Sequence, residues 1–187
     1  MIIKGRSHKM RIIAGTYKNI RLISPKGQAI RPTSDRVREW IFSCLIAEIR
    51  GAHVLDLFAG TGAFGLEALS RGAGAVTFVD CTKQAFDLTK MNLTKTGALA
   101  PVVKNDAISF LTGTLEQYDI IFCDPPYKYD QFGKLVEIIQ ARNLLAQQGI
   151  LIYETDRHES RIELSGFCRK REKTLSRTRV VFYQYEL

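Results

Sequence analysis

The strongest constraint on the fold is a regular alternation, from residue 53 onward, of short apolar runs with helical segments. The apolar runs occupy residues 53–58, 75–80, 101–105, 118–123 and 150–154. Helical periodicity covers residues 63–71, 83–95 and 131–146. Strands that alternate with helices form a parallel sheet with both faces covered. The pattern therefore predicts an α/β fold.

The end of the chain departs from this alternation. Residues 168–175 and 179–187 are two β-rich runs separated by only three residues. Such a short connection favours antiparallel pairing, because a parallel crossover needs a dozen residues or more. Together with the five preceding runs, these two predict a seven-stranded, mostly parallel sheet that ends in an antiparallel hairpin.

A basic segment precedes the α/β pattern. Residues 10–24 have two short β-rich arms and predict a small β-hairpin, and residues 35–49 have the apolar spacing of a helix. We expect the chain to divide into a basic hairpin and loop over residues 1–33 and a larger α/β domain over residues 34–187.

Charge is distributed unevenly along the chain. The net charge is +8, with 27 basic and 19 acidic residues, and residues 1–40 alone carry ten basic against two acidic side chains. Residues 157–187 carry eight basic against four acidic side chains, whereas the middle of the chain is net acidic. Basic ends around an acidic centre indicate that a polyanion is bound from the periphery and a neutral or cationic ligand at the centre.

Several other classes of protein are not indicated. No stretch approaches the roughly 20 apolar residues that span a bilayer, and the N-terminus lacks the features of a signal peptide, so we expect a cytoplasmic protein. The four cysteines lie about 40 residues apart with no CxxC pair, which argues against a disulfide framework and against a metal site.

The first motif with chemical content runs from Asp56 to Gly65 and reads DLFAGTGAFG. Glycines directly after a strand allow a sharp turn and a close approach of ligand to backbone. The spacing Gly60-x-Gly62-x-x-Gly65, with Asp80 20 residues after Gly60, fits the binding of a nucleoside cofactor. By itself this motif permits either NAD or S-adenosylmethionine.

Asp56 favours the second cofactor. A carboxylate at the end of the first strand can accept a hydrogen bond from a cationic amino group, directly or through water. It would suit the amino-acid end of S-adenosylmethionine and would repel a pyrophosphate. The alternative is that Asp56 is only a structural turn residue.

The second motif is Asp124-Pro125-Pro126-Tyr127, directly after the apolar run IIFC. Two prolines remove two backbone donors, so carbonyl oxygens, the Asp124 carboxylate and an aromatic ring remain. Acceptors beside a stacking face suit an exocyclic NH2 group on a base.

Here the sequence resembles a known family. Residues 10 to about 155 are similar to the RsmD family of bacterial 16S ribosomal RNA guanine-N2 methyltransferases, through the segments RIIAGTYKNIRLISP, RPTSDRVREWIF, LDLFAGTGAFGLEALSRGA and IIFCDPPY. Departures are small, since Asp80 stands where the family commonly has Glu and Tyr127 where Phe is also seen. The resemblance implies a Rossmann-like class I methyltransferase that uses S-adenosylmethionine, acts on 16S rRNA within a small ribosomal subunit or assembly intermediate, and is a monomer.

The resemblance also implies roles for individual residues. Those expected to bind the cofactor are Asp56, Phe58, Gly60, Thr61, Gly62, Asp80 and Asp106. Those expected to hold the target base and act in catalysis are Asp124, Pro125, Pro126 and Tyr127. Near the start of the first helix, those expected to contact the RNA are Arg31, Thr33, Arg36 and Arg38, although helix-surface ion pairs would explain the same arginines.

Three other interpretations stay open at this point. A DNA adenine-N6 methyltransferase would share the proline motif, but a reader of DNA sequence normally needs a larger recognition region than about 40 residues. An NAD-dependent oxidoreductase would explain the glycines but not the prolines. A non-catalytic RNA-binding module would explain only the basic ends.

Overall fold

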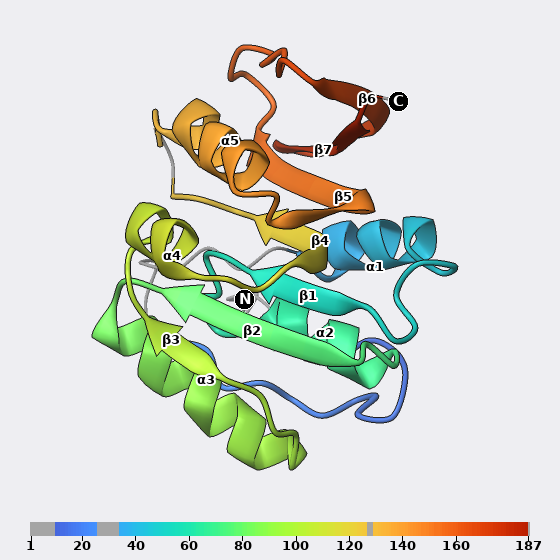
Figure 1. The fold of residues 1–187 in the computed structure, drawn as a ribbon. Coiled ribbons are helices and arrows are strands. Elements are labelled where there is room, and N and C mark those ends of the chain that lie inside the picture. Colours follow the sequence, from blue (N-terminus) through green and yellow to red (C-terminus); the bar gives the residue numbers. More distant parts are fainter. Residues whose placement is uncertain (1–9, 26–33, 127–128, 187) are drawn as a thin grey trace.

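The computed structural model of the chain describes residues 10–25, 34–126 and 129–186. Its centre is one seven-stranded sheet with the strand order β3-β2-β1-β4-β5-β7-β6 (Figure 1). The strands are β1 (His53–Asp56), β2 (Ala75–Asp80), β3 (Val102–Lys104), β4 (Tyr118–Cys123), β5 (Leu145–Asp156), β6 (Phe167–Leu175) and β7 (Thr178–Tyr185). The helices are α1 (Asp35–Cys44), α2 (Ala63–Ser70), α3 (Lys83–Thr96), α4 (Ala107–Gly113) and α5 (Phe132–Ala141). Strands β1 to β5 pair in parallel, which confirms the predicted α/β fold.

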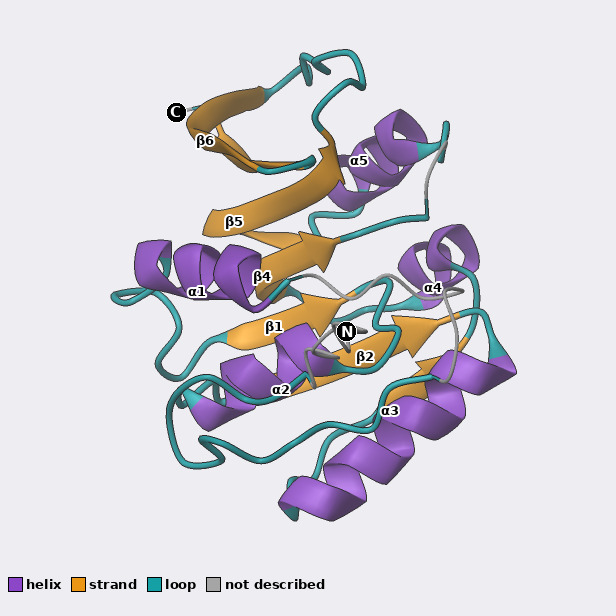
Figure 2. Cartoon of the chain, turned by 180° about the vertical axis from the view of Figure 1, so that it is seen from behind, coloured by secondary structure: helices purple, strands orange, loops and turns teal. Residues whose placement is uncertain are grey.

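Both faces of the sheet are buried, each under its own helices. Val54 and Ile120 belong to one apolar core, whereas Leu55 and Ile121, the next residues along each strand, belong to the other. Helices α1, α2 and α3 cover the first face and α4 and α5 the second (Figure 1 and Figure 2). Burial on both faces explains why these strands read as continuous apolar runs rather than as alternating ones.

The C-terminal hairpin is present as predicted. Strand β7 pairs antiparallel with both β5 and β6, and Leu175 lies opposite Thr178 across a two-residue turn. The hairpin packs back on α1, where the rings of Trp40 and Phe182 meet edge to face with centroids 5.5 Å apart. This packing joins β7, the last strand, to the first helix, α1.

Two helices are shorter than their apolar periodicity predicts. Helix α1 ends at Cys44 instead of residue 49, because the chain turns at Leu45, whose carbonyl accepts bonds from two of the next four N–H groups. Helix α5 ends at Ala141 instead of residue 146, because Asn143 adopts a left-handed φ of 52° and β5 already begins at Leu145. None of the described helices is both long and apolar enough to cross a lipid bilayer.

The small hairpin predicted for residues 10–24 is present only as a short, irregular pairing. Within the described part of this segment, the two arms share a single isolated antiparallel bridge, between Arg11 and Arg21. Backbone hydrogen bonds flank this bridge, from the Ile12 N–H to the Ile20 carbonyl at 3.0 Å and from the Leu22 N–H to the Met10 carbonyl at 2.9 Å. Other N–H groups of the arms donate to the buried Glu67 carboxylate of α2 and the buried Asn92 amide oxygen of α3, at 2.7 Å in each case. The segment is thus hydrogen-bonded to the α/β unit, and the division of the chain at residue 33 stays a prediction.

Gly65 allows α2 to lie close against the sheet. A Cβ at this position would be 2.2 Å from a ring carbon of Phe78. We expect Gly65→Ala to lower the free energy of unfolding by about 1–3 kcal/mol, because the extra methyl group overpacks this contact. In α5 a Cβ at Gly133 meets no described atom within 4 Å, so Gly133→Ala is the matched control and should stabilise slightly. Urea denaturation measures both, and equal midpoints for the two variants would contradict the close packing.

Candidate active site

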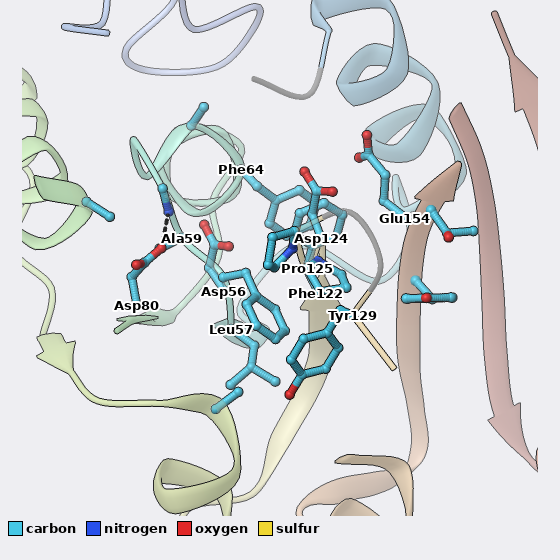
Figure 3. Close-up of a pocket in the computed structure, with 18 of the residues that line it drawn as sticks. Asp56, Leu57, Ala59, Phe64, Asp80, Phe122, Asp124, Pro125, Tyr129 and Glu154 are labelled. Atoms are coloured by element: carbon cyan, nitrogen blue, oxygen red, sulfur yellow. Dashed lines mark hydrogen bonds between the residues drawn. The ribbon is translucent and has the colours of Figure 1, made fainter. Parts of the chain in front are cut away.

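A cavity of about 620 Å³ lies at the carboxyl edge of the parallel strands. Ligands of open α/β sheets bind at this edge. Each of the strands β1 to β5 brings a carboxylate to the cavity wall, within the strand or up to two residues after it: Asp56, Asp80, Asp106, Asp124 and Glu154. Figure 3 shows four of these five carboxylates around the aromatic and aliphatic side chains of the wall. An acidic wall of this kind favours ligands that carry hydrogen-bond donors or positive charge.

The loop between β1 and α2 depends on glycines with left-handed backbone. Gly60 has a φ of 56° and Gly62 a φ of 75°, values that side chains rarely tolerate. The Gly60 N–H donates to Asp80 at 3.0 Å, and its carbonyl accepts from the Thr89 hydroxyl at 3.2 Å. Gly60 and Thr61 line the cavity, whereas Gly62 forms the N-cap of α2 and lies outside the lining. Gly62 therefore supports the loop rather than the wall.

Asp56 is a buried carboxylate with unused hydrogen-bonding capacity. One of its oxygens accepts from the Gly65 N–H at 3.0 Å, and the other has no partner among the described residues. The pKa of Asp56 is raised to about 7, mainly by burial and to a smaller extent by the charges of Asp124 and Asp80. The hydrogen bond from Gly65 acts in the opposite direction. A cationic donor in the cavity would bond the second oxygen and stabilise the charged carboxylate. Asp56 is therefore suited to a cationic amino group, and its assignment to the amino group of S-adenosylmethionine stays a prediction.

Asp80 and Asp106 provide further acceptors on the same wall. Asp80 also accepts from the N–H and the hydroxyl of Thr82, at 2.9 and 3.0 Å. Asp106 caps α4 by accepting from the Ser109 N–H at 2.9 Å, and hydrogen bonds from Ser109 lower its pKa. Both carboxylates line the cavity together with Phe58. Their positions suit the hydroxyl and amino groups of a nucleoside.

The proline motif follows β4 directly and borders the same cavity. Asp124, Pro125 and Pro126 all line it, and Asp124 is partly exposed there (Figure 3). Since neither proline has an N–H group, this stretch presents acceptors only. Tyr127 lies outside the described residues.

The structure describes two of the four residues predicted to contact RNA, Arg36 and Arg38. Arg36 is exposed on α1, and Arg31 and Thr33 lie outside the described residues. The prediction that Arg38 contacts the substrate is wrong, because its side chain is 0% exposed. Its guanidinium donates to Asp35 at 2.8 Å and to a backbone carbonyl of the N-terminal segment at 2.7 Å, and burial lowers its pKa. Arg38 joins α1 to the N-terminal segment.

Sequence reasoning missed part of the cavity wall. Glu154 on β5 is 6% exposed and lines the cavity. Like the other acids it lies near the end of an apolar strand, and this position in the sequence could have predicted that it belongs to the site. Tyr129 also lines it and meets the ring of Phe58 edge to face at 5.3 Å. The turn between β6 and β7, residues 175–178, completes the wall. The gap before residue 179 predicted the turn itself, but no sequence signal indicated that it lines the cavity, because its position depends on how the hairpin folds back.

These residues make one cavity with two kinds of wall. Asp56, Asp80 and Asp106 surround a space suited to a nucleoside with a cationic end. Asp124 and Pro125 provide an adjoining group of acceptors suited to a second ligand with an amino group. Among the described residues, no group of three or more His, Cys, Asp or Glu side chains is placed to hold a metal ion.

Most of the chain is similar to known proteins in sequence and in structure. The family model described as Conserved hypothetical protein 95 matches residues 10–184. Ribosomal RNA small subunit methyltransferase D of Escherichia coli K12 is 35% identical over 151 residues, which cover 80% of this chain and 76% of that protein. The protein of the same name from Haemophilus influenzae is 32% identical over 181 residues, covering 94% and 92%. The solved structure "Putative methyltransferase yhhF from Escherichia coli" has a TM-score of 0.86 at 33% identity and covers 94% of this chain and 97% of that one.

Proposed function

The chain belongs to the Conserved hypothetical protein 95 family, and on that premise we propose that it transfers a methyl group from S-adenosylmethionine to the exocyclic N2 of a guanine in 16S ribosomal RNA. Two of the relatives compared above carry the name ribosomal RNA small subunit methyltransferase D, the family that the sequence motifs resemble. The observation that carries the proposal is the acceptor-only stretch Asp124-Pro125-Pro126 in the same cavity as Asp56. This juxtaposition accounts for both ligands of the reaction.

The residues of the first wall fit the cofactor. When bound, S-adenosylmethionine supplies an electrophilic methyl group. Asp56 would hold its amino group, Asp80 the ribose hydroxyls and Asp106 the adenine amine. Phe58, Gly60 and Thr61 would complete the pocket around it. The unpartnered oxygen of Asp56 supports this orientation, because it lacks a donor in the described protein.

The proline motif would prepare the target nitrogen. Guanine N2 is a poor nucleophile, because its lone pair is delocalised into the ring. Hydrogen bonds from its two N–H groups to the Asp124 carboxylate and the Pro125 carbonyl would favour a tetrahedral nitrogen with a localised lone pair. The base must leave its stack to reach this place, and Tyr127 would provide the stacking face. Asp124 need not be a strong base, because the nitrogen becomes acidic only as the new C–N bond forms.

Ribosomal RNA is the favoured substrate over DNA. The relatives named above are rRNA enzymes, so the DNA adenine-N6 alternative is not favoured, and an oxidoreductase would not explain the proline motif. The basic residues 1–33, together with Arg36 on α1, would contact the RNA. We place the enzyme in the cytoplasm, as a monomer that acts on a small ribosomal subunit or an assembly intermediate.

A methyl-transfer assay tests the proposal. Small subunits and protein-free 16S RNA from cells that lack this enzyme would be incubated with labelled S-adenosylmethionine, and the RNA then digested to nucleosides. We expect N2-methylguanosine, formed faster on subunits than on protein-free RNA. N6-methyladenine on DNA with no transfer to RNA would overturn the substrate, and equal rates on both RNA substrates would overturn the requirement for assembled subunits.

A further inference from the structure

Arg177 is the only lysine or arginine among the described residues that line the cavity. The same wall carries seven carboxylates: Asp56, Asp80, Asp106, Asp124, Glu154, Asp156 and Glu159. An RNA nucleotide that enters this cavity brings a phosphate with it, and carboxylates repel a phosphate at short range. Among the described residues of the cavity wall, Arg177 is therefore the one that offers a positive charge to a phosphate.

The side chain of Arg177 is available, unlike those of most arginines around it. Arg161 and Arg169 form ion pairs with Glu172, and Arg179 is buried and donates to two backbone carbonyls. Arg177 is exposed, and its guanidinium makes no ion pair or hydrogen bond with any residue that the structure describes. An exposed guanidinium that lines an acidic cavity, without a partner in the described part of the chain, is in a position to bind an anionic group of a ligand.

The backbone holds Arg177 in place. It lies in the two-residue turn between β6 and β7, where Ser176 adopts a left-handed φ of 59°. Its carbonyl accepts a hydrogen bond from the Arg157 N–H at 2.9 Å, and Thr178 pairs with Asp156 at the end of β5. The turn thus lies beside the carboxyl end of β5, and β5 is the neighbour of β4, which the proline motif follows.

We propose that Arg177 binds a phosphate of the RNA strand at the target nucleotide, and so holds the extruded base in the cavity beside Asp124. A guanidinium can donate two parallel hydrogen bonds to one phosphate, which fixes orientation as well as affinity. The inference rests on the proposed function and extends it, because it gives the C-terminal hairpin a role in substrate binding.

The test compares Arg177→Gln with Arg171→Gln. Arg171 is exposed on β6 of the same hairpin, its guanidinium makes no ion pair or hydrogen bond with a described residue, and it does not line the cavity, so it controls for the loss of one positive charge. Methyl transfer to small subunits would be measured over a range of salt concentrations, and S-adenosylmethionine binding by calorimetry. For Arg177→Gln we expect the KM for small subunits to be about tenfold higher than that of the unmodified protein. The slope of log affinity against log salt concentration should become smaller in magnitude by about one. The affinity of Arg177→Gln for S-adenosylmethionine should equal that of the unmodified protein. In Arg177→Lys, which keeps the positive charge, the rise in KM should be smaller than in Arg177→Gln.

The outcomes separate this inference from the proposed function. If the unmodified protein methylates RNA but Arg177→Gln behaves like Arg171→Gln, the phosphate contact is wrong and the proposed function stands. If the unmodified protein transfers no methyl group to any RNA, the proposed function fails and the inference fails with it. A fall in thermal stability of Arg177→Gln, absent in Arg171→Gln and without a change in salt slope, would also overturn the inference, because it would mark Arg177 as structural.

Discussion

Replacing Asp124 with alanine is expected to lower the turnover of methyl transfer by about 10²–10³-fold, while the affinity for S-adenosylmethionine changes only a few-fold. The reason is that Asp124 lies in the acceptor stretch after β4, where it would hold an N–H group of the target base. Loss of this acceptor would remove an interaction that matters most in the transition state. Single-turnover kinetics with saturating cofactor measures the first effect, and calorimetry the second.

The control for this variant is Asp130→Ala. Asp130 is an exposed acid six residues further along, and it does not line the cavity. We expect its replacement to leave turnover within about twofold, as is usual for surface positions. Equal losses of turnover and cofactor affinity in Asp124→Ala would contradict the assignment and would place Asp124 with the cofactor instead. Unchanged turnover would exclude it from the reaction altogether.

Asp56→Asn is expected to weaken S-adenosylmethionine binding by roughly 10–100-fold at pH 8, the effect of losing a charge-assisted hydrogen bond. The pH dependence has a definite sign. Because the pKa of Asp56 in the free protein is about 7, the carboxylate is charged only above that pH, and affinity should rise as pH increases from about 6 to 8. In Asp56→Asn this part of the pH dependence should disappear. Calorimetric titrations at several pH values measure both effects.

The same substitution should stabilise the protein without cofactor. The pKa of Asp56 is raised on folding from 3.8 to about 7, so the folded state holds its proton more tightly and loses stability as pH rises between those values. At pH 8 we expect Asp56→Asn to be more stable by roughly 2–4 kcal/mol, and the difference to vanish below about pH 4. The control is Asp87→Asn, because Asp87 forms an exposed ion pair with Lys83. We expect no gain in stability at pH 8 for this variant. A less stable Asp56→Asn would mean that the Gly65 hydrogen bond stabilises the charged carboxylate by more than burial destabilises it.

The order of elements followed from local pattern. Apolar runs of five or six residues between amphipathic segments predicted β1 to β5, and the three-residue gap before residue 179 predicted the antiparallel hairpin. The candidate site followed from the same logic, because acids at the carboxyl ends of parallel strands must meet at one edge of the sheet. Asp56, Asp80, Asp106 and Asp124 all line the cavity for this reason.

Contacts between distant segments could not be predicted in this way. Arg36 and Arg38 are two residues apart on one helix, yet one is exposed and the other buried, because the carbonyl that Arg38 binds belongs to a segment 27 residues away. The N-terminal arms pair with each other over only a few residues, and further N–H groups of the arms donate to the buried side chains of Glu67 and Asn92, which lie far away in the sequence.

The sequence by itself therefore determined the α/β order of elements, the glycine turn and the proline motif, since each depends on the backbone properties of neighbouring residues. Only the tertiary structure decided which arginines meet solvent and which loop closes the cavity. Burial of Arg38 and the placement of Arg177 at the cavity mouth both result from packing between segments far apart in the chain, and packing of that kind leaves no periodic trace in the sequence.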